Sequence, residues 1–155
     1  MGRIVVGVDG SEGSRQALLW AVDEAKLRDA SLSVIHTYEH HLSWRGYGLD
    51  ESMSAATVEA MRQEIESAAR EAATHAQSLV DRMVAGLDGL DVESVAVESS
   101  HPAETLVDHS KGADLLVVGS RGRGGFKSLM LGSVSQQCAQ HAQCPVVIIR
   151  SEPAE

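Results

Sequence analysis

The chain has 155 residues, enough for one domain with a substantial hydrophobic core and too few for two ordinary domains. Hydrophobic residues make up 43% and charged residues 23%, values that exclude a wholly disordered chain. The formal net charge of −9 argues against non-specific binding to nucleic acid or to an anionic membrane. We therefore expect a single domain over residues 1–155, with neither nucleic acid nor membrane as a partner.

The N-terminal residues lead directly into an apolar segment, and no apolar run approaches the roughly 20 residues that span a bilayer. Cys138 and Cys144 are the only cysteines. One falls in a predicted helix and the other just before a predicted strand, so we expect reduced thiols rather than a disulfide. These features indicate a cytoplasmic protein.

Apolar strand patterns alternate with helical patterns along the chain. Aromatic residues are only 3% of the sequence, which leaves branched aliphatic residues to build the core, as in parallel sheets covered by helices. In chain order, the patterns predict strands at 3–9, 31–37, 92–98, 114–119 and 145–150, and helices at 14–28, 55–84, 102–111 and 133–141.

Two of these elements carry expectations about packing. In the second strand, Leu32, Val34 and Ile35 are expected to pack under the apolar stripe of the first helix. The long helix repeats apolar residues every three or four positions from Met61 to Met83, which predicts a core face along its whole length.

The connecting segments are less regular. Residues 38–54 have no period and are interpreted as a variable loop, and residues 151–155 as a short C-terminal tail. Trp44 and Tyr47 in this loop could fold over a ligand as a lid, although such residues more often only anchor a loop.

Strands joined by helices of this length pair in parallel through crossovers. The predicted fold is therefore an open, doubly wound, five-stranded parallel sheet of Rossmann-like α/β class, with helices on both faces. Such sheets bind ligands at the carboxyl ends of the strands, where the strand order reverses. This rule selects residues 7–11 after the first strand and 119–133 after the fourth.

The second of these junctions suits an anion. Glycines let a ligand approach main-chain N–H groups, and a helix N-terminus adds unpaired donors and a partial positive charge. Ser133 and Ser135 could add hydroxyl donors, and Arg121, Arg123 and Lys127 could add full charges. No Asp or Glu occurs between positions 115 and 150. Burial in an apolar core explains the lack of acidic residues in the strands of this stretch, but not in its loop.

Other constellations fit poorly. The loop is not a Walker A motif, because Lys127 follows Phe126 rather than glycine, and the third glycine of the dinucleotide fingerprint is missing. The seven histidines lack the spacing of metal ligands, and no G-x-S-x-G elbow is present. We predict no metal site and assign no catalytic residue.

The complete spacing of the loop, Gly119-x2-Gly122-x9-Gly132-Ser133, resembles the G-x2-G-x9-G-[ST] loop of the universal stress protein family, in its ATP-binding branch. The resemblance covers nearly the whole chain. It includes V-G-V-D-G-S at the first strand, V-I-H-T at the second, and D-L-L-V-V-G-S-R-G, L-G-S-V-S and C-P-V-V-I-I-R toward the end.

By this resemblance, the glycines and the start of the last helix would hold ribose and phosphates, and Asp9 would lie at the adenosine end beside the adenine pocket. The alternative for Asp9 is an Asx turn or a helix cap, but the accompanying glycine-rich loop favours the nucleotide role. The expected ATP-binding residues are Val8, Asp9, Thr37, Val118, Gly119, Arg121, Gly122, Gly132, Ser133, Val134 and Ser135.

The implied function is a stress-response regulatory module that binds ATP, with Mg²⁺ or Mn²⁺ as a possible companion and slow hydrolysis at most. A cyclic-AMP binder and a true ATPase or nucleotidyl-transferring enzyme remain alternatives. The resemblance also implies a homodimer formed through the last strand, from Val146 to Arg150.

Overall fold

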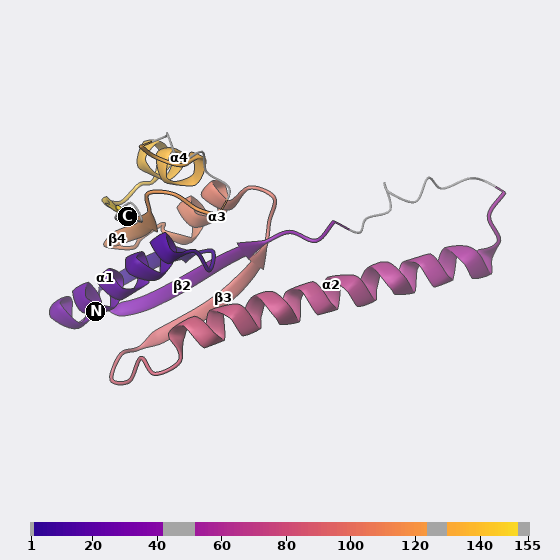
Figure 1. Cartoon of the computed structure of the whole chain (residues 1–155), viewed down its shortest axis with the longest axis horizontal. Coiled ribbons are helices and arrows are strands. Elements are labelled where there is room, and N and C mark those ends of the chain that lie inside the picture. The colour runs from indigo at the N-terminus through magenta and orange to yellow at the C-terminus, as the bar shows by residue number, and fades with distance from the viewer. Residues whose placement is uncertain (1, 42–51, 124–129, 152–155) are drawn as a thin grey trace.

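The structure is a computed structural model that describes residues 2–41, 52–123 and 130–151. Within these residues, strands and helices alternate along the chain (Figure 1). The elements are β1 (Arg3–Val8), α1 (Glu12–Arg28), β2 (Ser31–Tyr38), α2 (Ala55–Val84), β3 (Val92–Glu98), α3 (Pro102–His109), β4 (Leu115–Gly119), α4 (Ser133–His141) and β5 (Val146–Ile149). The predicted order and type of every element are confirmed.

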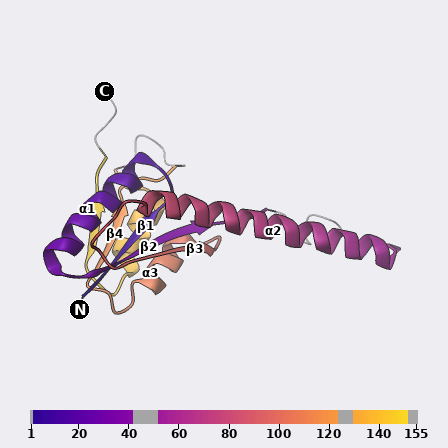
Figure 2. The same cartoon turned by 90° about the horizontal axis from the view of Figure 1, so that it is seen from below.

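The strands form one parallel sheet in the order β3-β2-β1-β4-β5. The chain moves outward from β1 to β3 and then crosses back to β4, so the strand order reverses between β1 and β4. Figure 2 shows α1 and α2 on one side of the sheet and α3 on the other. The predicted doubly wound α/β architecture is confirmed.

Each face of the sheet has its own apolar core. Val34 faces α1 together with Ile4 and Leu18, whereas Ile35 packs against Leu106 on the opposite face. The prediction that Ile35 packs under α1 is therefore wrong. Successive side chains of a strand point to opposite faces, so neighbouring residues of β2 cannot share one.

The expectation that α2 is core along its whole length is also wrong. Only Ala76 and Val80 of this helix are buried, and Met61 and Ile65 remain half-exposed. A helix of 30 residues is about 45 Å long, whereas the strands beneath it reach only about 25 Å. The N-terminal half of α2 therefore extends beyond the sheet (Figure 1).

The first helix begins two residues earlier than the pattern predicted. Ser11 has an extended backbone (φ −71°, ψ 161°), and its side chain accepts a hydrogen bond from the N–H of Ser14. This is the geometry of an N-cap, which places Glu12 in the first helical turn.

The two edges of the sheet differ. At the β3 edge, the Gln77 side chain accepts from the N–H of Ala96 at 3.0 Å and donates to the carbonyl of Ser94 at 3.3 Å. The Gln77 amide thus occupies one main-chain donor and one main-chain acceptor of β3, which a further strand would need in order to pair with this edge. At the other edge, all four residues of β5 are apolar and half-buried.

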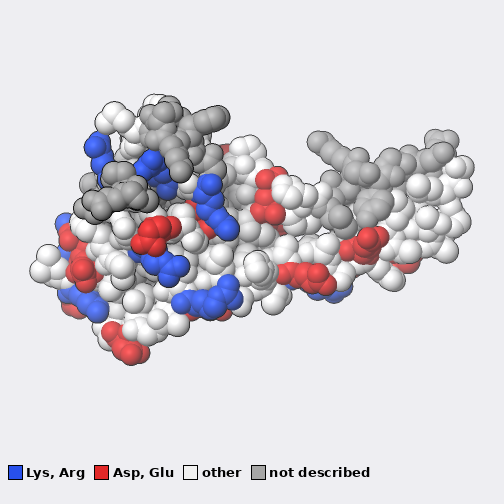
Figure 3. Space-filling model, viewed as in Figure 1, with Lys and Arg blue, Asp and Glu red and all other residues white. Residues whose placement is uncertain are grey.

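The expectations for Trp44, Tyr47 and Lys127, and for most of the C-terminal tail, lie outside the described residues. In the described part of the chain, no helix has both the length and the apolar character needed to cross a membrane. On the face seen in Figure 3, described acidic and basic side chains are interspersed rather than gathered into one basic surface.

Candidate functional site

A cavity of about 650 Å³ opens at the edge of the sheet where the carboxyl ends of β1, β2 and β4 meet. This is the point at which the strand order reverses, the usual position of ligand sites in open parallel sheets. Its size is in the range of small-molecule pockets. The side walls come from two helices, with Ala76 and Leu79 of α2 and Leu106 of α3 among the lining residues.

The eleven residues expected from the sequence to bind nucleotide come together around this one cavity, although they are spread over 128 positions, from 8 to 135. The residues that line it are Val8, Asp9, Thr37, Val118, Gly119, Arg121, Gly122, Gly132, Ser133, Val134 and Ser135.

The N-terminus of α4 lacks a side-chain cap. Gly132 is its N-cap residue, with φ −78° and ψ 168°, nearly the backbone conformation of Ser11 and Ser54 at the starts of α1 and α2. Those two serines each accept a hydrogen bond from an N–H of the first helical turn. Because Gly132 has no side chain, the first turn of α4 has no such cap among the described residues, and Ser133, Val134 and Ser135 of that turn line the cavity.

Main-chain contacts brace this open helix end. The carbonyl oxygen of Ser120, the residue after β4, accepts from the N–H of Gly132 at 2.7 Å and from the Ser135 hydroxyl at 2.8 Å. Ser135 is buried, and its hydroxyl also lies 3.0 Å from the carbonyl oxygen of Gly132. Its hydroxyl hydrogen is therefore directed to the main chain, whereas the sequence suggested this hydroxyl as a donor to an anion.

Two glycines allow the close approach of segments around the cavity. A Cβ on Gly119 would lie 3.0 Å from main-chain atoms of Gly13, so only glycine lets the end of β4 approach α1 this closely. A Cβ on Gly122 would lie 2.7 Å from Oδ2 of Asp9. The loop after β4 therefore rests directly on the loop after β1.

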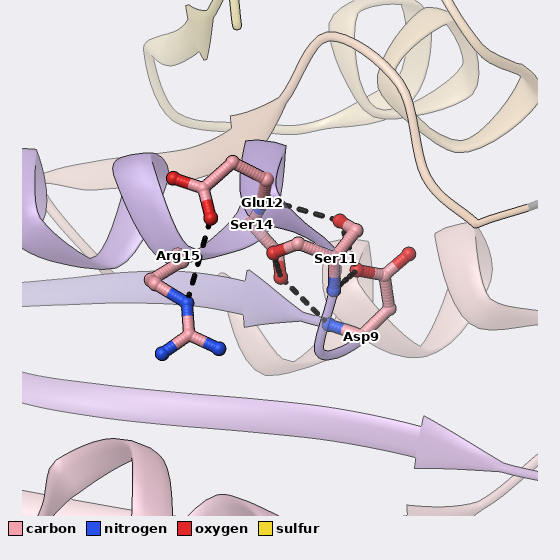
Figure 4. Close-up of polar contacts among 5 residues, drawn as sticks. All are labelled: Asp9, Ser11, Glu12, Ser14 and Arg15. Carbon is pink, nitrogen blue, oxygen red and sulfur yellow. Dashed lines mark hydrogen bonds and ion pairs between the residues drawn. The ribbon is translucent and has the colours of Figure 1, made fainter.

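Asp9 joins these two loops. Its Oδ1 accepts from the N–H of Ser11 at 2.9 Å and from the Ser11 hydroxyl, and its Oδ2 accepts from the N–H of Arg123 at 3.0 Å. Ser14 completes the network by accepting from the N–H of Asp9 (Figure 4). The Asx turn that the sequence left open for Asp9 is therefore present, together with a tie to the glycine-rich loop, whereas the cap of α1 is Ser11.

The same contacts set the charge of the Asp9 carboxyl. Partial burial raises its pKa, but the hydrogen bonds from Ser11 and from the N–H of Arg123 stabilise the carboxylate and, with the nearby Ser14 hydroxyl, outweigh burial. The net result is a pKa below the ordinary value, so Asp9 is ionised at neutral pH.

Several lining residues carried no sequence signal for the site. His36, Ala72, Ala76 and Leu79 line the cavity from β2 and α2, on the face of the sheet that α2 covers. Strand alternation could have placed His36 on that face, since it lies two residues after Val34. Nothing in the sequence indicated which turn of α2 would reach the strand ends.

Among the described residues, no group of three or more His, Cys, Asp or Glu side chains could hold a metal ion. Cys138 and Cys144 are free thiols. Burial in the core beneath α4 raises the pKa of Cys138 to about 11, so this thiol is protonated and unreactive at neutral pH.

A parallel sheet whose strand order reverses beside a helix N-terminus is the architecture of the doubly wound, Rossmann-like α/β folds. The chain belongs to the universal stress protein family, whose model matches residues 1–150. This finding confirms the resemblance seen in the sequence.

Individual relatives agree with this assignment. A universal stress protein of Mycolicibacterium smegmatis is 35% identical over 150 residues, which cover 96% of this chain and 48% of that protein. Universal stress protein YxiE of Bacillus subtilis is 32% identical over 152 residues, with 96% and 98% covered. The chain thus spans about half the length of the mycobacterial relatives it matches. A solved universal stress protein in complex with cAMP is 25% identical, covers 96% of this chain and 95% of its own, and has a TM-score of 0.57.

Proposed function

We propose that this chain is a regulatory binding module that holds an adenine nucleotide, ATP, in the cavity at the strand ends. The observation that carries the proposal is the open N-terminus of α4, where Gly132 stands in the conformation of a capping serine but offers no acceptor. The N–H groups of Ser133, Val134 and Ser135 would donate to the phosphates, helped by the helix dipole. The relative solved with cAMP supports an adenine nucleotide as the ligand class.

In this proposal the base and ribose lie toward β1 and β2. Val8, Thr37 and Val118 line that part of the cavity, and Asp9 stands at the junction between the two loops. A carboxylate can accept about four hydrogen bonds, and Asp9 already accepts three. Asp9 therefore has room for one ribose hydroxyl, while its main task is to hold the loops in place.

The choice of ATP over cyclic AMP rests on charge. The cavity reaches Arg121 and Arg123, and positions 115–150 contain no acidic residue to oppose a polyphosphate. A divalent ion would travel with the phosphates, because no described acidic cluster could hold it alone. We expect at most slow hydrolysis, since Asp9, the carboxylate that joins the two loops, is already engaged by main-chain and serine donors.

The first test is to denature freshly purified protein and identify any released nucleotide by chromatography. Nucleotide-free protein is then titrated calorimetrically with ATP and with cyclic AMP. We expect adenine nucleotide in the released fraction and tighter binding of ATP. Tighter binding of cyclic AMP would favour the cyclic-nucleotide alternative, and no binding of either would refute the proposal.

We further propose that the chain forms a homodimer through β5. The β3 edge is occupied by the Gln77 amide, whereas β5 presents four half-buried apolar residues at the opposite edge. An uncovered apolar edge strand is a liability that pairing with a second copy would remove. The free thiols suit the reducing cytosol, where we expect this dimer to work.

Sedimentation at micromolar concentration should therefore give about twice the 16.5 kDa mass of one chain. Replacing Ile148 with proline removes a main-chain donor from the edge strand and should shift the protein toward the monomer. A wild-type protein that sediments at 16.5 kDa would contradict the dimer but would leave the nucleotide site untouched.

A further inference from the structure

The outer edge of β3 is paired with a side chain instead of a further strand. All seven residues of β3 are exposed or half-exposed, whereas β1 and β4 are almost wholly buried. β3 is the last strand on its side of the sheet, and the C-terminal part of α2 lies beside it (Figure 1). An edge strand offers unpaired main-chain groups to any strand that approaches, including one from a second copy of the chain.

The register with β2 determines which main-chain groups of β3 point outward. The N–H of Leu32 in β2 donates to the carbonyl of Asp91, just before β3, and the N–H of Ser99, just after β3, donates back to the end of β2. The odd-numbered residues of β3 therefore face β2, because successive residues of a strand turn their main-chain groups to opposite sides. Ser94 and Ala96 consequently turn theirs outward.

The Gln77 side chain of α2 takes the place that a residue of a further strand would have. Its amide nitrogen donates to the carbonyl of Ser94 at 3.3 Å, and its amide oxygen accepts from the N–H of Ala96 at 3.0 Å. In a parallel pair, a single residue of the neighbouring strand makes these same two bonds. An antiparallel strand would also need both groups. The centre of the β3 edge is thus already paired.

Asp81 fixes the orientation of this amide. It lies one helical turn after Gln77, and its Oδ1 accepts from the Gln77 amide nitrogen at 2.9 Å and from the Ser94 hydroxyl at 3.2 Å. The two hydrogens of the amide nitrogen are therefore directed to two acceptors, the carboxylate of Asp81 and the carbonyl of Ser94. A flipped amide would set its oxygen against both acceptors and its nitrogen against the N–H of Ala96. Only one orientation of the amide satisfies all four groups.

We infer that Gln77 prevents a second copy of the chain from pairing with the β3 edge, which leaves assembly to the β5 edge. The charged residues of β3, Glu93 and Glu98, lie near its two ends, so the uncharged centre at residues 94–97 depends on the glutamine for protection. A chain with both edges open would have two self-pairing surfaces and could grow beyond a dimer. The inference does not depend on nucleotide binding.

The test compares the masses of variants by sedimentation over a series of protein concentrations. Gln77→Ala removes the amide, keeps a good helix former and leaves Asp81 in place. Its weight-average mass should rise to at least about twice that of the wild type at the same concentration. Gln77→Lys also removes the amide but places a positive charge at the edge, and it should keep the wild-type mass. Gln63→Ala, an exposed change on the same helix at a residue that bonds to Glu59, is the matched control and should also keep it.

The comparison is repeated in Ile148→Pro protein, so that the result does not depend on the proposed dimer. There too, Gln77→Ala should raise the mass at least about twofold. A folded Gln77→Ala protein with the wild-type mass at every concentration overturns the inference. An equal rise in Gln77→Lys overturns it as well, because it would indicate a general loss of stability rather than an opened edge. A monomeric wild type would contradict only the dimer through β5.

Hydrogen exchange of the wild type tests the cap even if Gln77→Ala fails to fold. The N–H of Ala96 points away from β2, and its acceptor is the Gln77 amide oxygen. We expect this amide to exchange at least about tenfold more slowly than an unprotected one. Exchange of the Ala96 amide at the rate of an unprotected amide would overturn the inference.

Discussion

Replacing Gly132 with aspartate should abolish nucleotide binding while leaving the fold intact or slightly more stable. The backbone at Gly132 matches that of the capping residues Ser11 and Ser54. An aspartate there would accept hydrogen bonds from the first turn of α4, and its charge would suit the helix dipole. We expect the free energy of unfolding to stay level or rise by up to about 1 kcal/mol. The affinity for ATP should fall at least about 100-fold, because the phosphates would lose these donors and meet a negative charge.

Two further variants at position 132 separate the causes. Gly132→Asn caps the helix without adding charge and should weaken ATP binding less than aspartate does. Gly132→Ala adds only a Cβ, which would lie 3.4 Å from the carbonyl oxygen of Ser120, an ordinary contact that the fold can accept. Urea unfolding and calorimetry measure the two effects independently. A folded Gly132→Asp protein that binds ATP as tightly as the wild type would rule out the open helix end as the phosphate site.

Replacing Asp9 with asparagine should destabilise the protein at neutral pH and disturb the glycine-rich loop. Both oxygens of Asp9 accept hydrogen bonds, one from Ser11 and the other from the N–H of Arg123. An asparagine must turn its NH₂ group toward one of these donors, so at least one contact is lost. We expect the free energy of unfolding to fall by about 1–2 kcal/mol, the lower part of the range for charged hydrogen bonds, because the carboxyl is only partly buried.

The difference between wild type and Asp9→Asn should depend on pH with a definite sign. The pKa of Asp9 is lower in the folded protein than its ordinary value of 3.8. The stabilisation by the carboxylate is therefore fully present above about pH 4 and is lost as the pH falls through the folded-state pKa. Urea unfolding at pH 7, 4 and 3 should show the two proteins converging in acid. Asp23→Asn, an exposed change on α1, is the control and should remain within about 0.5 kcal/mol of wild type. A gap for Asp9→Asn that stays constant down to pH 3 would contradict the assigned role of the carboxylate.

Many residues that line the candidate site could be proposed from the sequence because its parts are local. Gly132 and Ser133 lie where a loop that follows a predicted strand leads into a predicted helix. The strand, the loop and the helix start are each recognised from only a few neighbouring residues. The open N-terminus of α4 is likewise a local property, since capping depends on the side chain at the N-cap position. The residues Val8, Thr37 and Val118 were placed by family resemblance rather than by any local rule.

The roles of individual atoms were less predictable. Ser135 was expected to donate its hydroxyl to a ligand, but the hydroxyl donates to the carbonyl of Ser120, which lies fifteen positions away. Asp9 satisfies its Oδ2 with Arg123, which is 114 positions away. Such contacts form only when segments far apart in the sequence pack against each other. Local sequence patterns do not predict which segments will do so.

Sequence alone determined the alternation of strands and helices, the parallel sheet and the position of the glycine-rich junction, because hydrophobic period and turn chemistry act over a few residues. Only the tertiary structure decided that the sheet order is β3-β2-β1-β4-β5, that α2 outruns the sheet, and that His36 shares a cavity with Gly132. These features arise from many weak contacts between distant segments, and it is their sum over the whole chain that selects one arrangement.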